Sequence, residues 1–356
     1  MHWSDIPADS LAVLRRGSVI PAHLLALDAR RQLDPRRQRA ITRYYLDAGA
    51  GGLAVGVHAT QFAIRETGLY QPVLALAMQT AREWTPLGGT RPLFMIAGLA
   101  GKTAQAVQEA TTARALGYHA GLLSLAAMQG ASEDALMAHC EAVATVLPVV
   151  GFYLQPAVGG MVLPASFWQR FAGIDNVVAI KMAPFNRYHT LDVVRAVVAA
   201  GAEQRVTLYT GNDDHIVLDL LAPFSIMRDG QPVTVRIKGG LLGHWSVWTQ
   251  RAVQLLERLH LAVERGPIPP DLLALDGQVT DCNSALFDVA HDFQGCIAGC
   301  HEVLRRQGLL EGIWCLDPQE GLSPGQAEEL TRVHAAYPEL HDDIFVRAHL
   351  HRWMAD

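Results

Sequence analysis

Short apolar runs alternate along most of the chain with longer segments whose apolar residues recur at helical spacing. Apolar runs of four to eight residues bounded by glycine, proline or asparagine are typical of buried strands in a parallel sheet. Eight such runs predict strands, over residues 17–27 with the following loop, 53–56, 93–96, 121–125, 148–154, 176–184, 206–210 and 233–237. Helices are predicted between them, over residues 35–48, 71–84, 103–116, 133–146, 191–200, from 214, and over 246–265.

Eight strand and helix units with short connections predict an α/β fold, a closed (β/α)8 TIM barrel. An early GxGxxG turn would indicate an open doubly wound sheet instead, and the sequence has no such turn. From Pro267 onward the pattern changes to helices alone, most clearly over residues 283–307 and 324–337. We therefore expect a barrel over residues 1–265 and a C-terminal helical region over 266–356, which serves as a cap or an interface element.

Composition adds limits to this architecture. Half of the 356 residues are hydrophobic and 18% are charged, which suits a large buried core. The net charge of −6 and the lack of a basic block argue against nucleic acid as a partner. The five cysteines form no CxxC pair and the N-terminus has no apolar signal core, which predicts a cytoplasmic protein with reduced thiols.

Two segments raise alternatives that the sequence argues against. Residues 142–169 carry no charge, but three prolines and three glycines interrupt them, so we expect no membrane span. Cys296, Cys300 and His301 lie close together in one predicted helix without a complete four-ligand zinc pattern. We expect these three residues to pack in the core, and we expect neither a metal nor a cofactor.

Lys181 is the one charged residue of the predicted strand over residues 176–184. Alternation places it on the same face as Val177 and Ala179, near the carboxyl end of the strand, where barrel enzymes hold their catalytic groups. Partial burial disfavours the ammonium form, so a fraction of this lysine can be the free amine that attacks a carbonyl carbon. A lysine that follows the strand and extends its ammonium group to solvent is the alternative.

Six segments carry a resemblance that links this lysine to a family. They are IPAHLLAL near the start, YYLDAGAGGLAVG, GFYLQP, AIKMAP, YTGNDD and GGLLGHWSV. In order and spacing they resemble the dihydrodipicolinate synthase and N-acetylneuraminate lyase family of Schiff-base barrel enzymes, over roughly residues 15–300. The resemblance implies a barrel, usually a homotetramer, whose lysine forms an imine with pyruvate or another 2-oxo acid. The enamine then adds to an aldehyde or is released from one.

Tyr153 precedes Lys181 by 28 residues, which is the spacing that the family has between its catalytic tyrosine and lysine. On the predicted strand Tyr153 shares a face with Gly151, so its phenol is expected to project into the barrel and relay protons beside Lys181. The alternative is a core tyrosine bound to a backbone carbonyl. The resemblance therefore assigns Lys181 as the nucleophile and Tyr153 as the acid and base.

The predicted loop after the second strand departs from the family. The family's loop of glycine, two threonines, glycine and glutamate grips the oxo-acid carboxylate, and it falls here on Val57, His58, Ala59, Thr60 and Gln61. Both threonines are missing at the aligned places, although the backbone amides remain and His58 offers a donor or a charge. His58, Ala59, Thr60 and Gln61 are the residues expected to bind substrate here.

Other family positions have also changed. The usual asparagine after Tyr153 is Leu154, and Val158 stands where the synthases carry an arginine for the carboxylate of the second substrate. The second tyrosine of the synthases falls at residues 126–128, where the chain has none. We therefore do not expect a role in lysine biosynthesis.

Three more polar or glycine positions follow predicted strands and are candidates for substrate binding. His23 ends the first strand, and Asn212 follows the seventh, although residues 212–214 also fit a helix N-cap. Gly240, with Gly239, follows the eighth strand and could cradle a phosphate. His244 and Trp245 either frame a pocket or pack together.

The sequence thus predicts a Schiff-base lyase or aldolase for a 2-oxo acid or a related carbonyl compound. The glycine pair leaves open a class I aldolase for a sugar phosphate, and the changed loop leaves open a barrel that binds a small molecule without turnover. The expected partners are the carbonyl substrate and copies of the same chain, in a dimer or tetramer.

Overall fold

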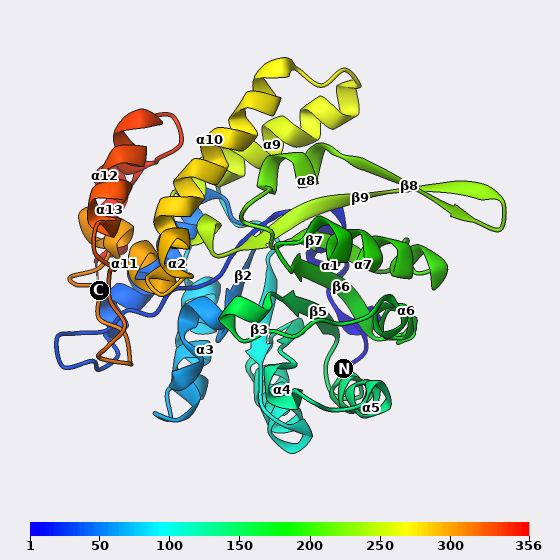
Figure 1. The fold of residues 1–356 in the computed structure, drawn as a ribbon. Helices are drawn as coiled ribbons and strands as arrows, with labels where there is room; N and C mark the ends of the chain where they lie inside the picture. Colours follow the sequence, from blue (N-terminus) through cyan, green and yellow to red (C-terminus); the bar gives the residue numbers. More distant parts are fainter. Residues whose placement is uncertain (356) are drawn as a thin grey trace.

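The computed structural model describes residues 1–355 and confirms a TIM barrel with a C-terminal helical extension (Figure 1). Eight parallel strands follow the order β1-β9-β7-β6-β5-β4-β3-β2, and a bridge between Ala22 and Ala54 joins the ends of this row. The barrel strands are β1 Val19–Pro21, β2 Gly52–Val55, β3 Phe94–Leu99, β4 Ala120–Leu123, β5 Val149–Leu154, β6 Val177–Ala183, β7 Thr207–Thr210 and β9 Gln231–Leu242.

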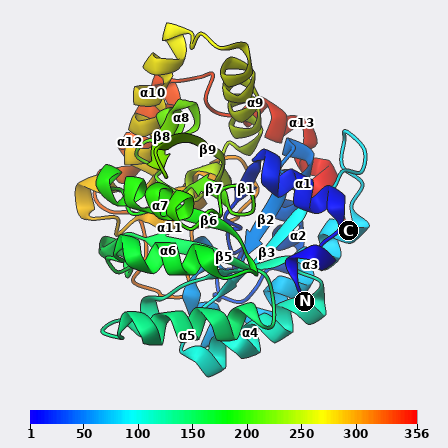
Figure 2. The same cartoon turned by 90° about the vertical axis from the view of Figure 1, so that its right-hand side faces the viewer.

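Helices surround the strands, and α4 to α7 follow one another around the barrel, each packed against the next (Figure 2). Side-chain caps begin three of them, α2, α5 and α7; in α2, Asp34 accepts a hydrogen bond from the backbone N–H of Arg37. The barrel helices are α1 Ala8–Arg16, α2 Pro35–Ala48, α3 Tyr70–Glu83, α4 Thr103–Leu116, α5 Glu133–Ala144, α6 Ala165–Gly173, α7 Arg187–Ala199, α8 Ile216–Leu221 and α9 Thr249–Arg265.

The eighth predicted strand is displaced. Residues 231–236 form a hairpin with β8 Pro223–Arg228 that projects from the barrel, and the barrel is completed by residues 237–242 of β9 (Figure 1). The hairpin turns at Asp229 and Gly230, both with positive φ, as a two-residue turn requires. The alternation of apolar and polar residues over 233–236 belongs to a half-exposed antiparallel strand, which the prediction mistook for a barrel strand.

The C-terminal extension consists of α10 Pro270–Leu286, α11 Cys296–Arg306, α12 Gln326–Ala336 and α13 Asp343–Trp353. The single helix predicted over residues 283–307 is wrong, because Asp288, Asp292 and Phe293 have positive φ and interrupt it between α10 and α11. Buried residues of the extension belong to the same hydrophobic core cluster as those of the barrel. None of the helices within residues 1–355 is both long and apolar enough to cross a membrane.

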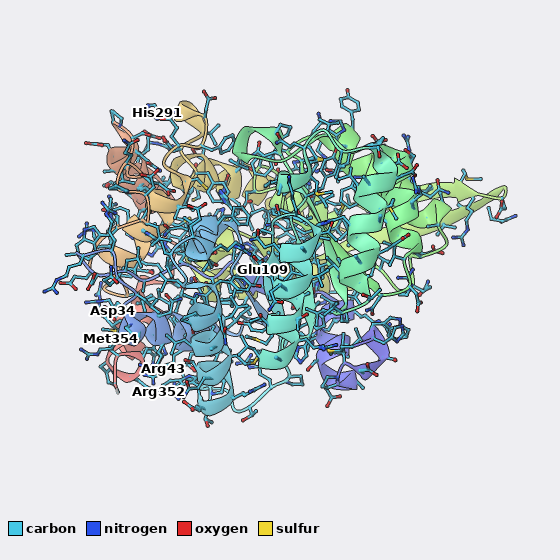
Figure 3. All side chains as sticks on the ribbon, turned by 90° about the horizontal axis from the view of Figure 1, so that it is seen from below. Asp34, Arg43, Glu109, His291, Arg352 and Met354 are labelled. Atoms are coloured by element: carbon cyan, nitrogen blue, oxygen red, sulfur yellow. The ribbon has the colours of Figure 1, made fainter. Side chains whose placement is uncertain are left out.

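The last helix packs on α2 at one edge of the molecule, where Figure 3 labels Arg43, Arg352 and Met354. Arg352 forms an ion pair with the fully buried carboxylate of Asp47 in α2, and the indole N–H of Trp353 donates to the same carboxylate at 2.6 Å. Arg43 donates to the backbone carbonyl of Trp353 at 2.7 Å. The chain end is therefore fixed to the barrel by buried polar contacts.

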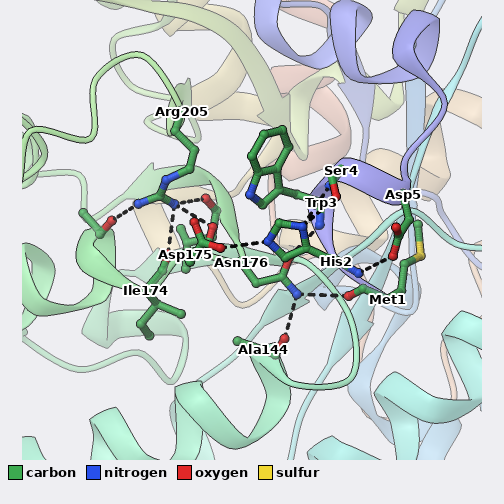
Figure 4. Close-up of polar contacts among 12 residues, drawn as sticks. Met1, His2, Trp3, Ser4, Asp5, Ala144, Ile174, Asp175, Asn176 and Arg205 are labelled. Atoms are coloured by element: carbon green, nitrogen blue, oxygen red, sulfur yellow. Dashed lines mark hydrogen bonds and ion pairs between the residues drawn. The ribbon is translucent and has the colours of Figure 1, made fainter.

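The N-terminal segment fixes the beginning of β6 (Figure 4). The Asn176 amide donates to the carbonyls of Met1 and Ala144 and accepts from the backbone N–H of Trp3. Arg205 donates to the carbonyl of Ile174 at 2.9 Å. These contacts satisfy the polar backbone at the amino end of the strand that carries Lys181.

Candidate active site

Lys181 lies in the middle of a strand that is buried along its whole length. Its register neighbours are Phe152 on β5 and Tyr209 on β7, so the three side chains point into the barrel. Lys181 is 8% exposed, and with Ala183 it lines a cavity at the carboxyl end of the strands. The alternative of a lysine that reaches bulk solvent is therefore wrong.

The cavity has a volume of about 60 Å³. An enclosed water needs roughly 10–15 Å³ in the same measure, so the space suits a molecule of a few heavy atoms. Most of the lining is apolar, and it contains no arginine. The lining residues are Ala22, Leu24, Val57, His58, Ala59, Phe152, Leu154, Gln155, Val158, Lys181, Ala183, Phe185, Gly211, Asp213, Gly243, Phe287, Phe293, Cys296, Ile297 and Cys300.

Burial controls the charge of Lys181. It lowers the pKa of the amine to about 8, and the nearby Asp213 and Cys296 oppose this shift. The amine nitrogen lies 4.5 Å from the centroid of the Phe152 ring, where a cation–π contact favours the ammonium form. A Cβ at Gly211 would stand 2.5 Å from Cε of Lys181, so glycine leaves the room that this side chain occupies. Near neutral pH a useful fraction of Lys181 is therefore the nucleophilic amine.

Asp213 is the second ionisable group of the cavity, and the sequence did not single it out as a site residue. The backbone N–H of His244 donates to its carboxyl group at 2.9 Å. Burial raises its pKa to about 7, whereas this hydrogen bond and the charge of Lys181 lower it. The helix-cap interpretation of residues 212–214 is wrong, because α8 begins at Ile216 and no side chain caps it. The signal in the sequence was an acidic residue three positions after the end of the seventh strand.

Tyr153 does not face Lys181. Gly151 and Tyr153 do share a face, but it is the outer face of β5, where a Cβ at Gly151 would meet Phe171 and Trp168 of α6. The Tyr153 ring packs on Trp168, and its hydroxyl donates to the carbonyl of Leu163 and accepts from the N–H of the same residue, both at 3.2 Å. The predicted position beside the lysine belongs to Phe152, so the assignment of Tyr153 as acid and base is corrected.

Of the predicted loop residues, His58 and Ala59 line the cavity. Burial, and then the charge of Lys181, lowers the pKa of His58 to about 4, so the imidazole is neutral there. Thr60 is turned away, because its hydroxyl donates to the carbonyl of His23 and accepts from the N–H of Gly56. Gln61 binds the extension instead, accepting a hydrogen bond from the N–H of Leu316 at 2.6 Å.

His23 and Asn212 are buried outside the cavity, contrary to expectation. The His23 ring contacts the hydroxyl of Thr42 and the amide of Gln38 on α2. The Asn212 amide donates to Thr190 and Asp219 and accepts from the N–H of Phe185. These hydrogen bonds join the ends of the strands to the surrounding helices and loops.

Gly240 lies within β9 and not in a loop, so it does not form a phosphate cradle. It pairs with Val19 of β1 and Thr210 of β7, and its N–H donates to the carbonyl of Ser18. A Cβ there would stand 2.4 Å from the ring of Trp245, which explains the glycine by packing. His244 and Trp245 are buried and do not line the cavity.

The extension supplies one wall of the cavity, which sequence reasoning did not foresee. Phe287 follows α10, Phe293 precedes α11, and Cys296, Ile297 and Cys300 lie on α11. Burial raises the pKa of both thiols well above the usual range, so they are neutral wall groups. The extension thus covers the mouth of its own barrel, and the expectation that Cys296 and Cys300 only pack in the core is incomplete.

Solved structures share this fold at low sequence identity. The dihydrodipicolinate synthase from Acinetobacter baumannii complexed with pyruvate is 16% identical, with a TM-score of 0.72 over 91% of this chain and 99% of that one. YagE, a prophage protein from E. coli K12 in complex with pyruvate, is 18% identical, with a TM-score of 0.71 over 91% and 98%. A monomeric dihydrodipicolinate synthase variant is 17% identical, with a TM-score of 0.74 over 93% and 98%.

The sequence itself gives the family. No curated protein matches the chain. The profile of the Dihydrodipicolinate synthetase family matches residues 15–223, which is more than half of the chain and includes the strand that carries Lys181. The chain therefore belongs to the Dihydrodipicolinate synthetase family.

Proposed function

We propose that the protein is a class I lyase or aldolase that binds a small 2-oxo acid of the pyruvate type as a Schiff base on Lys181. The observation that carries the proposal is a buried amine of lowered pKa on the wall of a small cavity. Two solved structures of the same fold are described as complexes with pyruvate, which supports the choice of donor.

Asp213 supplies the proton transfers in this proposal. The neutral amine attacks the C2 carbonyl carbon, and the protonated carboxyl gives a proton to the oxygen as it becomes a hydroxyl group. The resulting carboxylate takes a proton from the attached nitrogen and returns it to that hydroxyl, which leaves as water and gives the protonated imine. Its carboxylate then removes a proton from C3 and forms the enamine. A carboxyl whose pKa is raised to about 7 suits both directions of transfer near neutral pH.

The loop after β2 is the proposed binding site for the oxo-acid carboxylate. Among residues 1–355 nothing accepts a hydrogen bond from the backbone N–H of His58 or of Ala59, and both residues line the cavity. Free backbone amides bind carboxylates well, and the neutral imidazole of His58 adds a possible ring N–H donor. The backbone amides and the His58 ring would bind the carboxylate in place of the threonine hydroxyls that the family has in this loop.

The second substrate, or the released aldehyde, is proposed to lack a carboxylate. Val158 and several aromatic rings line the cavity, and no arginine lines it. A buried carboxylate without a cationic partner would be strongly disfavoured there. We therefore propose a reaction other than dihydrodipicolinate synthesis.

A barrel that binds its ligand without turnover is the second candidate. The outward position of Tyr153 favours it, because the phenol that does lie beside Lys181, that of Tyr209, donates to the backbone carbonyl of Leu14. The sugar-phosphate alternative has lost its motivation, since Gly240 lies inside a strand. The five buried, unpaired cysteines support the proposal of a reducing, cytoplasmic location. A homodimer or homotetramer stays a prediction.

Borohydride trapping tests the proposal directly. The chain has three lysines, Lys102, Lys181 and Lys238, so peptide mapping identifies the modified one without ambiguity. Reduction in the presence of pyruvate, and of a panel of other 2-oxo acids, is expected to leave one adduct, on Lys181. Lys181→Ala should give no adduct, and Lys238→Ala, at an exposed lysine, should react like the wild type.

Three results separate the candidates. An adduct on Lys181 together with aldehyde-dependent turnover supports the lyase. An adduct without turnover of any aldehyde supports the binding barrel. The absence of any adduct on Lys181 with every 2-oxo acid would refute imine chemistry at this site.

A further inference from the structure

A cluster of two histidines and one aspartate lies in the extension, away from the cavity. His334 is near the end of α12, His341 is in the following loop, and Asp343 begins α13. One ligand atom from each lies within 4.8 Å of the other two. The carboxylate oxygen Oδ2 of Asp343 is 2.6 Å from Nε2 of His334 and 3.6 Å from Nδ1 of His341.

The imidazole of His341 is not satisfied by the protein. Its Nδ1 is buried and has no hydrogen-bond partner in the described chain, and 3.6 Å to Asp343 is too long for a hydrogen bond. Its ring stacks on that of His334 with 3.9 Å between centroids and an interplanar angle of 11°. Buried polar atoms without partners are rare in folded proteins and call for an explanation.

Neighbouring groups hold the Asp343 carboxylate and the backbone of His341 in place. The amide of Gln307 donates to Oδ1 of Asp343 at 2.8 Å, which leaves Oδ2 turned to the imidazoles. Arg251 of α9 donates to the backbone carbonyl of His341 at 3.2 Å and fixes the loop. Supporting hydrogen bonds of this kind orient the ligands of metal sites.

We propose that Nε2 of His334, Nδ1 of His341 and Oδ2 of Asp343 bind one Zn²⁺ ion, with water as the fourth ligand. Ligands held tetrahedrally at about 2.0–2.1 Å from zinc lie roughly 3.3 Å apart, and the observed separations from Oδ2 lie on both sides of this value. Two imidazoles and a carboxylate suit zinc better than calcium or magnesium. The ion would join α12 to α13, and the expectation that the chain holds no metal would be revised.

Metal titration of the full chain, without a histidine tag, tests this site. Isothermal titration with ZnCl₂ should give one ion per chain, and Co²⁺ should show the intense visible bands of tetrahedral coordination. His341→Ala and Asp343→Asn should each weaken binding by more than about 100-fold. His351→Ala, at an exposed histidine on α13, is the matched control and should leave binding unchanged.

Circular dichroism of each variant shows whether it is folded, and Asp343→Asn keeps the shape of the side chain in case His341→Ala is disruptive. The proposal is overturned if the wild type does not take up one equivalent of Zn²⁺. It is also overturned if folded variants bind as tightly as the wild type, or if the Co²⁺ spectrum indicates octahedral coordination.

Discussion

Lys181 and Asp213 are opposite charges in one cavity, and burial acts against both of them. It lowers the pKa of the amine to about 8 and raises that of the carboxyl to about 7, while each charge partly restores the other. Burial therefore offsets part of the attraction between the two charges, so the neutral pair is less disfavoured here than it would be in water. A proton can therefore move between the groups and a bound carbonyl compound without a large penalty.

The neutral fraction of Lys181 is expected to rise with pH through a midpoint near 8, because burial lowers the pKa of the amine. In Asp213→Asn the midpoint should move to lower pH, since the carboxylate that raises the pKa of Lys181 is removed. Turnover should fall by about 10²–10⁴-fold at the same time. The pH profile of Lys181 acetylation by acetic anhydride, read by peptide mapping, and a steady-state assay measure the two effects.

Asp229→Asn is the control for this prediction, because Asp229 is exposed at the turn of the hairpin and does not line the cavity. It should change neither the midpoint nor turnover appreciably. A midpoint that stays in place or rises in Asp213→Asn would show that the carboxylate does not act on Lys181.

At the scale of elements, β5 decides which aromatic group stands beside the lysine. Its inner face presents Phe152 and Leu154 to the cavity, and its outer face presents Tyr153 to α6. The register between β5 and β6 shifts between Val149 and Val150, at the amino end of the strand. A change of one residue in such a register moves every side chain to the other face.

Tyr153→Phe should therefore leave trapping on Lys181 unchanged. The variant should lose about 1 kcal/mol of stability, since only the hydroxyl contacts with Leu163 are removed. Urea unfolding and the trapping rate measure both quantities. A loss of activity of 100-fold or more, with little change in stability, would restore the catalytic role that the spacing to Lys181 suggested.

The strands and helices could be predicted from the sequence where burial fixes their pattern of apolar residues. Apolar runs located seven of the eight barrel strands. Both faces of a buried parallel strand are covered, so most of its residues are apolar. Period-two alternation tells which residues share a face, but not which face turns inward, and Tyr153 was misplaced for this reason. The hairpin of β8 and β9 was not predicted, because the alternation of apolar and polar residues over 231–236 does not distinguish a projecting strand from a barrel strand.

At the scale of the whole molecule, the extension and the barrel form one core. Trp353 is fully buried between Tyr44 and Phe345, and its indole N–H binds Asp47. The sequence predicted helices here but not their place, because the residues that dock them are scattered along α2 and the tail. The side chains that the tail contributes to the cavity were missed for the same reason.

Trp353→Ala should reduce the free energy of unfolding by about 3–5 kcal/mol, because it leaves a large cavity and removes one partner of a buried carboxylate. Urea unfolding measures it, and the exposed His351→Ala on the same helix should change stability by less than about 0.5 kcal/mol. A cost for Trp353→Ala as small as that of the control would contradict the packed position of α13.

The wall that residues 287–300 contribute to the cavity affects how substrate specificity can evolve. The amine that performs the chemistry and the aromatic rings that meet the rest of the ligand stand on distant parts of the polypeptide. Substitutions within residues 287–300 can therefore change which ligand binds, while the strand that carries Lys181 stays unchanged. Selection for a new substrate would act first on Phe287, Phe293 and Ile297.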